Sequence, residues 1–138
     1  MDKGVGSLPG DVRDVVASSR RRAALYALET LDTQADPDFD HLTRIAASVM
    51  NVPIALVSLV DLDRQWFKSC IGLPDHETPI GISFCAHAIA GGDNVMVIED
   101  ATKDARFAQN PLITGAPTSA STPARQLRFR ARRSARFA

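Results

Sequence analysis

The segment from Pro53 to Ile71 constrains the fold more than any other part of this chain. Its first half, Pro53 to Asp61, reads PIALVSLVD and is mostly apolar at successive positions, as in a strand buried on both faces. Asp61 to Asp63 turns the chain, and Arg64 to Ile71 forms the return strand, which Gly72 ends. Two strands joined by so short a link form an antiparallel hairpin. The fold must therefore contain an antiparallel sheet.

Two helices are predicted ahead of this hairpin. In the first, from about Val12 to Leu31, apolar residues recur at spacings of three and four, and Arg20 to Arg22 are expected on its solvated side. In the second, Asp36 is suited to the N-cap, Pro37 to the first helical position and Asn51 to the helix end. The second helix carries one apolar stripe, made of Phe39, Leu42, Ile45, Ala46 and Val49.

Smaller elements are predicted after the hairpin. Residues 72–82 read as a loop, and Ser83 can cap a short helix from Phe84 to Ala90. Val95 to Ile98 is a third strand, and Ala101 to Phe107 is another short helix. The order predicts an α+β fold with a mainly antiparallel sheet flanked by helices. Three strands are few for these helices, so the sheet is expected to be incomplete, with its central strands missing.

The charge distribution divides the chain near residue 117. Residues 1–117 carry ten basic and 16 acidic residues, whereas residues 118–138 carry six arginines and no acidic residue. We expect three parts: a flexible N-terminus over residues 1–10, one folded unit over 11–117, and a disordered, Arg-rich tail over 118–138. The apolar residues of the tail follow neither the period of a strand nor that of a helix. The tail is not expected to bind nucleic acid specifically.

Four stretches together resemble the GAF domains of bacterial sensor kinases and cyclic-dinucleotide enzymes. They are RRAALYALETLDT at 21–33, FDHLTRIAASVMNVPIALVSLVDLDRQWFKSCIGL at 39–73, ETPIGISFCAHAI at 77–89 and VIEDATKDARFAQNPLITG at 97–115. The resemblance implies a central antiparallel sheet with helices on both faces. It further implies that the long N-terminal helices mediate a homodimer, and that the short helices enclose a pocket for a small molecule.

Beyond residue 117 the chain departs from the GAF pattern, which continues with strands resembling IRFYAGAPL and GTLCV. A one-base backward slip in the reading frame after Pro117 allows the tail to read HIRFYAGAPAALPGAALGTLC. We interpret the tail as a frameshift that truncates the domain at its C-terminal side. The alternative is an authentic basic extension.

Ser83 to His87 is the most suggestive cluster of candidate site residues. Ser83 is expected to cap its helix, while Phe84 and Cys85 pack and His87 faces either the pocket or a hydrogen-bond partner. On a helix, Cys85 and His87 point about 200° apart, which disfavours Cys-His catalysis. Cys70 and Cys85 lack the spacing of a zinc site or a disulfide framework.

The return strand and the end of the third strand supply further candidates. Trp66, Lys68 and Cys70 are expected on one face of the return strand, with the alternate residues on the other. Asp100 either accepts a hydrogen bond from a ligand or caps the next helix through its carboxylate. The predicted ligand-binding residues are Trp66, Lys68, Phe84, Cys85, His87 and Asp100, with no catalytic residue and no metal ligand. The identity of the ligand or of a cofactor does not follow from the sequence.

Three functions fit this pattern. The first is a regulatory module, not an enzyme, that binds a small molecule and acts on an output domain, either a histidine kinase or a cyclic-dinucleotide enzyme. The second is a redox enzyme using the Cys85 thiol, and the third is a non-functional remnant. The chain shows no apolar run long enough to span a membrane and no secretory signal, so the cytoplasm is the expected location.

Overall fold

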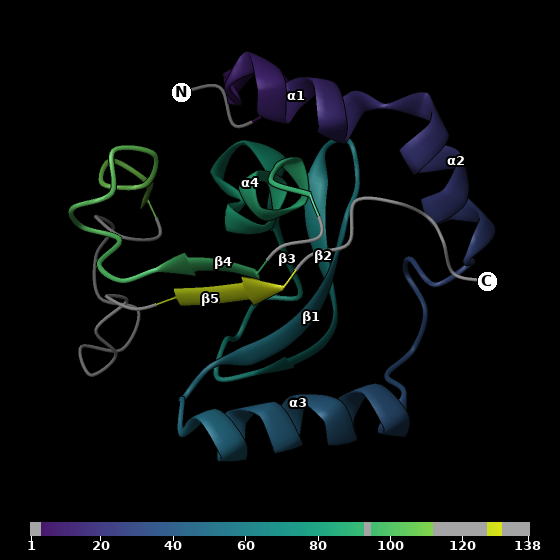
Figure 1. The fold of residues 1–138 in the computed structure, drawn as a ribbon. Helices are drawn as coiled ribbons and strands as arrows, with labels where there is room; N and C mark the ends of the chain where they lie inside the picture. Colours follow the sequence, from purple (N-terminus) through teal and green to yellow (C-terminus); the bar gives the residue numbers. More distant parts are fainter. Residues whose placement is uncertain (1–3, 93–94, 112–126, 131–138) are drawn as a thin grey trace.

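The computed structural model describes residues 4–92, 95–111 and 127–130, and it confirms the predicted α+β fold (Figure 1). The predicted hairpin is present as β1 (Ala55–Val60) and β2 (Arg64–Ile71), which pair antiparallel. A short strand, β3 (Glu77–Pro79), pairs with the other edge of β2, so the sheet has the order β1-β2-β3. The prediction of a loop over residues 72–82 is wrong at this strand and at the 3-10 helix η2 (Ile80–Ile82) that follows it.

The second predicted helix is confirmed as α3 (Pro37–Met50). The Asp36 side chain accepts a hydrogen bond from the backbone N–H of Asp38, and Asn51 ends the helix in the left-handed conformation, with φ of 50°. Gly72, where β2 ends, has φ of +87°, and a Cβ there would lie 2.2 Å from the carbonyl oxygen of Pro53. Only glycine fits this close approach.

The apolar stripe of α3 faces away from the sheet at Leu42, Ile45 and Val49, whereas Phe39 at its start is partly buried. α3 lies against one face of the hairpin, whereas α1 and α4 lie on the other side (Figure 1). Leu42, Ile45 and Val49 are 57%, 59% and 76% exposed, and the buried residue of α3 is Thr43. The helix is therefore held to the sheet through polar contacts, because the Thr43 hydroxyl lies 2.8 Å from that of Ser69 on β2.

The first predicted helix is broken in two. α1 (Gly10–Ala17) and α2 (Ser19–Ala27) meet at Ser18, whose extended ψ of 119° interrupts the helix and whose side chain accepts a bond from Arg21 N–H. Ahead of α1, the predicted flexible N-terminus contains the 3-10 helix η1 (Val5–Ser7) and the buried Leu8. The apolar core explains this, because Leu8 packs with α1, α4 (Phe84–Ala90) and the end of β1.

The third predicted strand is present as β4 (Val95–Ile98), but it belongs to a separate two-stranded sheet. Its antiparallel partner is β5 (Leu127–Arg130), within the tail that we predicted to be disordered. The prediction is wrong at these four residues: LRFR alternates apolar and basic residues, a period-2 pattern typical of a strand. Residues 112–126 and 131–138 of the tail lie outside the described residues.

Residues 101–109 form turns, so the short helix predicted from Ala101 to Phe107 is absent. Their apolar side chains are nevertheless buried, since Ala101 and Phe107 pack with Phe84 and Ile98 in a second small core. No helix within the described ranges is long and apolar enough to cross a bilayer.

Candidate functional site

A β-bulge at Lys68 interrupts the alternation of side chains along β2. Val57 of β1 lies opposite Ser69 and Ser58 lies opposite Phe67, so Lys68 is the extra residue on its strand. The bulge places Lys68 and Ser69 toward the same side, since both contact residues in or just before α3. The prediction that Lys68 and Ser69 occupy opposite faces is therefore wrong.

The Lys68 ammonium is buried beneath the segment that joins α2 to α3. The residue is 9% exposed, and its Nζ donates to the Thr33 hydroxyl at 2.7 Å and to the Gln34 carbonyl at 2.6 Å. It also lies 5.9 Å from the centre of the Phe39 ring. Both hydrogen-bond acceptors are neutral oxygens, so the side chain holds the preceding loop in place without forming an ion pair there.

An open hollow of about 360 Å³ lies beside Lys68. It brings together two of the predicted ligand-binding residues, Trp66 and Lys68, with residues from the segment after α2 and from the loop before β3. Its lining consists of Asp32, Thr33, Ala35, Trp66, Phe67, Lys68 and His76. The volume is at the small end of the range that ligand pockets span. Its wall combines a cation, aromatic rings and a carboxylate, and is therefore able to hold a small polar molecule.

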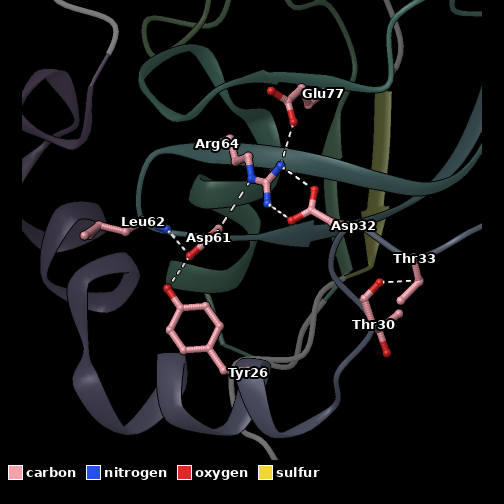
Figure 2. A network of polar contacts seen from close by, with 8 residues as sticks. All are labelled: Tyr26, Thr30, Asp32, Thr33, Asp61, Leu62, Arg64 and Glu77. Carbon is pink, nitrogen blue, oxygen red and sulfur yellow. Dashed lines mark hydrogen bonds and ion pairs between the residues drawn. The ribbon is translucent and has the colours of Figure 1, made fainter.

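Arg64 of the hairpin bonds to Asp32, a residue that lines this hollow (Figure 2). Its guanidinium donates to both carboxylate oxygens of Asp32, at 2.8 and 2.6 Å, and to Glu77 at 2.8 Å. Hydrogen bonds from Arg64 lower the pKa of the Asp32 carboxyl, and those to Asp32 and Glu77 raise the pKa of Arg64. The pairs are solvent-exposed and each contributes little to stability, but together they fix where Asp32 lies.

The two N-terminal helices are held to the end of β1 by polar contacts from α2. The phenol of Tyr26 donates to Asp61 at 2.6 Å, which raises the pKa of Tyr26 (Figure 2). Arg21 donates to the carbonyls of Val15, Val16 and Val60. Arg21 is therefore partly buried, contrary to the prediction that it lies on the solvated side of its helix.

Cys85 lies on the other side of the hairpin, within a polar network. Its sulfur accepts hydrogen bonds from the Ser58 hydroxyl at 3.3 Å and the Gln65 amide at 3.2 Å. The Ser83 hydroxyl donates to Gln65 and accepts the Ala86 N–H at 3.0 Å, which confirms Ser83 as the helix cap. Burial raises the pKa of the Cys85 thiol, whereas a reactive thiol needs a lowered pKa. This geometry gives no support to the redox alternative.

Phe84 and His87 contact Phe107 instead of Cys85. The ring centres lie 4.6 Å apart for Phe84 and Phe107, and 4.8 Å apart for His87 and Phe107. Phe84 is buried, and His87 is partly exposed in the last turn of α4. Burial, followed by the charge of Arg106, lowers the pKa of His87. His87 thus packs edge-on against the Phe107 ring, a contact different from the two roles left open by the sequence, the pocket and a hydrogen-bond partner.

Asp100 caps a turn. Its carboxylate accepts the Thr102 N–H at 3.0 Å and the Thr102 hydroxyl at 2.5 Å. It also borders a surface hollow of about 350 Å³ together with Lys103 and Asp104. In the ranges that the structure describes, no three His, Cys, Asp or Glu residues are grouped closely enough to hold a metal ion.

The six predicted ligand-binding residues thus fall into separate places. Trp66 and Lys68 share a hollow on the α3 side, Cys85 lies on the α4 side, Phe84 and His87 pack on Phe107, and Asp100 borders the second hollow. Sequence reasoning missed Asp32, Thr33 and His76 as neighbours of Lys68. The available signal was the polar segment TQAD after Asp32, which carries the acceptors for a buried lysine.

Comparison with known proteins gives one informative likeness. No known family profile matches the chain. A cyclic di-GMP phosphodiesterase of Pseudomonas aeruginosa is 43% identical over 97 residues, which is 70% of this chain and 16% of that protein. The prediction that this chain is not an enzyme is contradicted, because a relative at this identity is named as one. The chain is therefore similar to part of a protein of cyclic-dinucleotide signalling, and it spans about one sixth of that relative's length.

Proposed function

We propose that this chain is a GAF-type, small-molecule-responsive segment of a longer cyclic di-GMP signalling enzyme. The observation that carries the proposal is the 43% identity to a phosphodiesterase over 97 residues. Identity at this level over most of a domain supports a shared fold and a shared place in the parent protein. The matched region is 16% of that protein, and we assign to this region the control of the phosphodiesterase reaction.

The contacts around the hollow supply a route for that control. Asp32 and Thr33 line the hollow and also belong to the segment that joins α2 to α3. Arg64 holds Asp32 from the hairpin, and Lys68 holds Thr33. A ligand that binds beside Lys68 therefore contacts the segment that sets the position of α2. To act as a signal, the ligand must have different affinities for two positions of that segment.

We further propose that the sheet is incomplete in this chain. β1 is the last strand of its sheet in the part of the chain that the structure describes, although the sequence LVSLV is apolar enough for an interior strand. β4 lies in a separate sheet, and Val95 and Val97 are 54% and 47% exposed. Two further strands between β1 and β4, as in the shifted reading frame of the tail, would cover these groups.

A segment exchange tests the regulatory proposal. Three proteins are compared: the P. aeruginosa phosphodiesterase, the same enzyme without its matched segment, and the enzyme carrying this chain's segment in its place. Loss of the segment is expected to change the rate of cyclic di-GMP hydrolysis severalfold while turnover persists, and the exchange is expected to restore the original rate. An exchange that also carries Gly72→Ala, which forces a Cβ against the Pro53 carbonyl and is expected to destabilise the hairpin, serves as the matched control and is not expected to restore the full rate.

Two results would contradict the regulatory assignment. If removal of the segment abolishes turnover in a protein that remains folded, the segment belongs to the catalytic machinery. If removal leaves the rate and its response to cell extracts unchanged, the segment does not control the enzyme.

A further inference from the structure

The Lys68 ammonium is a buried positive charge without a carboxylate partner in the described part of the chain. The described ion pairs involve Arg64 and Arg106, and no Asp or Glu oxygen among the described residues lies within 4.0 Å of Lys68 Nζ. Two of its three N–H groups bond to neutral oxygens. Burying a charge is costly unless it is paired and hydrogen-bonded, so this ammonium is suited to an anion from outside.

The nearest acidic side chains have other partners. Asp32 holds Arg64 with both oxygens, Glu77 also bonds Arg64, and Asp40 accepts the Ser69 hydroxyl at 2.6 Å. These contacts draw each carboxylate toward a donor other than Lys68. The third N–H of Lys68 therefore has no partner from these groups, and the hollow lies beside it.

The lining of the hollow indicates which anion fits. Trp66, Phe67 and Ala35 contribute apolar surface, which favours an organic body over an inorganic ion. The Lys68 ammonium matches one negative charge, and a second charge on the same anion would be repelled by the Asp32 carboxylate, which also lines the hollow. We propose that the hollow binds a small organic monocarboxylate, whose carboxylate bonds to the third N–H of Lys68 while its carbon skeleton lies against Trp66. This inference rests on the proposed function for its biological role but not for its test.

The chain has a single tryptophan, so the fluorescence of Trp66 reports on the hollow directly. The full chain is titrated at constant ionic strength with propionate and, separately, with propionamide, which differs mainly in charge. A saturable change in fluorescence is expected with propionate and none with propionamide. Lys68→Gln is expected to weaken propionate binding at least about tenfold, because a charge-assisted hydrogen bond is lost. Lys103→Gln, a change at an exposed lysine, is the matched control and is expected to bind as the parent chain does.

Several outcomes would overturn the inference. Equal responses to propionate and propionamide would show that charge is not recognised, and the absence of a saturable response would show that no site exists. Unchanged binding in Lys68→Gln with an unaltered circular dichroism spectrum would remove Lys68 from the site. Tighter binding of inorganic phosphate would refute the carboxylate assignment. The segment exchange described above reads hydrolysis rates in another protein, so its failure is distinguishable from each of these outcomes.

Discussion

Replacing Arg21 with methionine tests whether one side chain holds the break between α1 and α2. The guanidinium donates to Val15 O at 3.2 Å, Val16 O at 2.8 Å and Val60 O at 2.6 Å. It therefore joins the end of α1 to the end of β1, where Val60 lies 39 residues after Arg21 in the chain. Methionine retains most of the apolar stem and removes all three donors.

The expected loss follows from these three bonds. A hydrogen bond to a charged group contributes about 1.5–3 kcal/mol to stability, and a carbonyl left without a donor costs more when it is buried. Water can replace part of the loss at Val15 and Val16, because the end of a helix leaves its last carbonyls open. The burial that lowers the pKa of Arg21 also opposes its charge. We therefore expect Arg21→Met to lower the free energy of unfolding by about 2–4 kcal/mol.

Urea unfolding followed by circular dichroism measures this change. Arg20→Met is the matched control, because Arg20 is exposed on the same helix and its loss is expected to change stability by less than about 0.5 kcal/mol. If Arg21→Met and Arg20→Met have the same free energy of unfolding within about 0.5 kcal/mol, the contacts of Arg21 do not hold the two helices to the sheet.

Three further predictions concern glycine, histidine and cysteine positions. Gly72→Ala is expected to cost about 1–3 kcal/mol more than Gly92→Ala, because both have positive φ but only the Cβ at 72 meets a carbonyl oxygen; equal urea midpoints would contradict this. Burial lowers the pKa of His87 below its ordinary 6.5, so the unfolded chain takes up a proton on this imidazole at higher pH than the folded chain does. The contribution of His87 to the free energy of unfolding should therefore be full above pH 6.5 and fall below it. His87→Gln should reduce the slope of that free energy against pH between about pH 6.5 and 5. An unchanged slope in that variant would remove His87 as its source. In a Cys70→Ser background, iodoacetamide should alkylate Cys85 at least about tenfold more slowly in the folded chain than in urea, since burial raises its pKa. Equal rates would show an accessible thiol.

The elements with strong local signals could be predicted from the sequence. Asp36 and Asn51 bound α3, Ser83 caps α4, and the short link between two apolar strands produced the hairpin. Each of these features depends on a few neighbouring residues whose backbone preferences agree. Asp100 was expected to cap a helix or to bind a ligand; the helix is absent, and its carboxylate accepts the N–H and hydroxyl of Thr102, two residues away.

The features that were missed depend on distant contacts. The helix break at Ser18 is not marked by a proline or glycine. It is held by Arg21, which donates to the Val60 carbonyl on β1. The bulge at Lys68 follows from how β1 pairs with β2, which reverses the alternation expected for an ideal strand. The outward face of α3 follows from the Thr43–Ser69 contact, which a hydrophobic stripe cannot anticipate.

The candidate site shows the same division. Trp66 and Lys68 were selected as neighbours on one strand, and the structure places both on one hollow. Phe84, Cys85, His87 and Asp100 were selected from the same expected pocket, but they contact different partners on α4 and the turns after β4. Residue type and order along the chain identified the polar groups, whereas the twist and layering of the sheet decided which of them lie together.

The measurement that tests the central proposal most directly is the DNA sequence of the gene from the codon for Gly115 to several hundred bases past Ala138. We expect a one-base change of frame after Pro117 to open a reading frame that begins with IRFYAG and GTLC. That frame should continue into a region resembling the remainder of the cyclic di-GMP phosphodiesterase. If no frame beyond Pro117 encodes such a continuation, the chain is not a segment of a longer signalling enzyme, and the regulatory proposal is wrong in its present form.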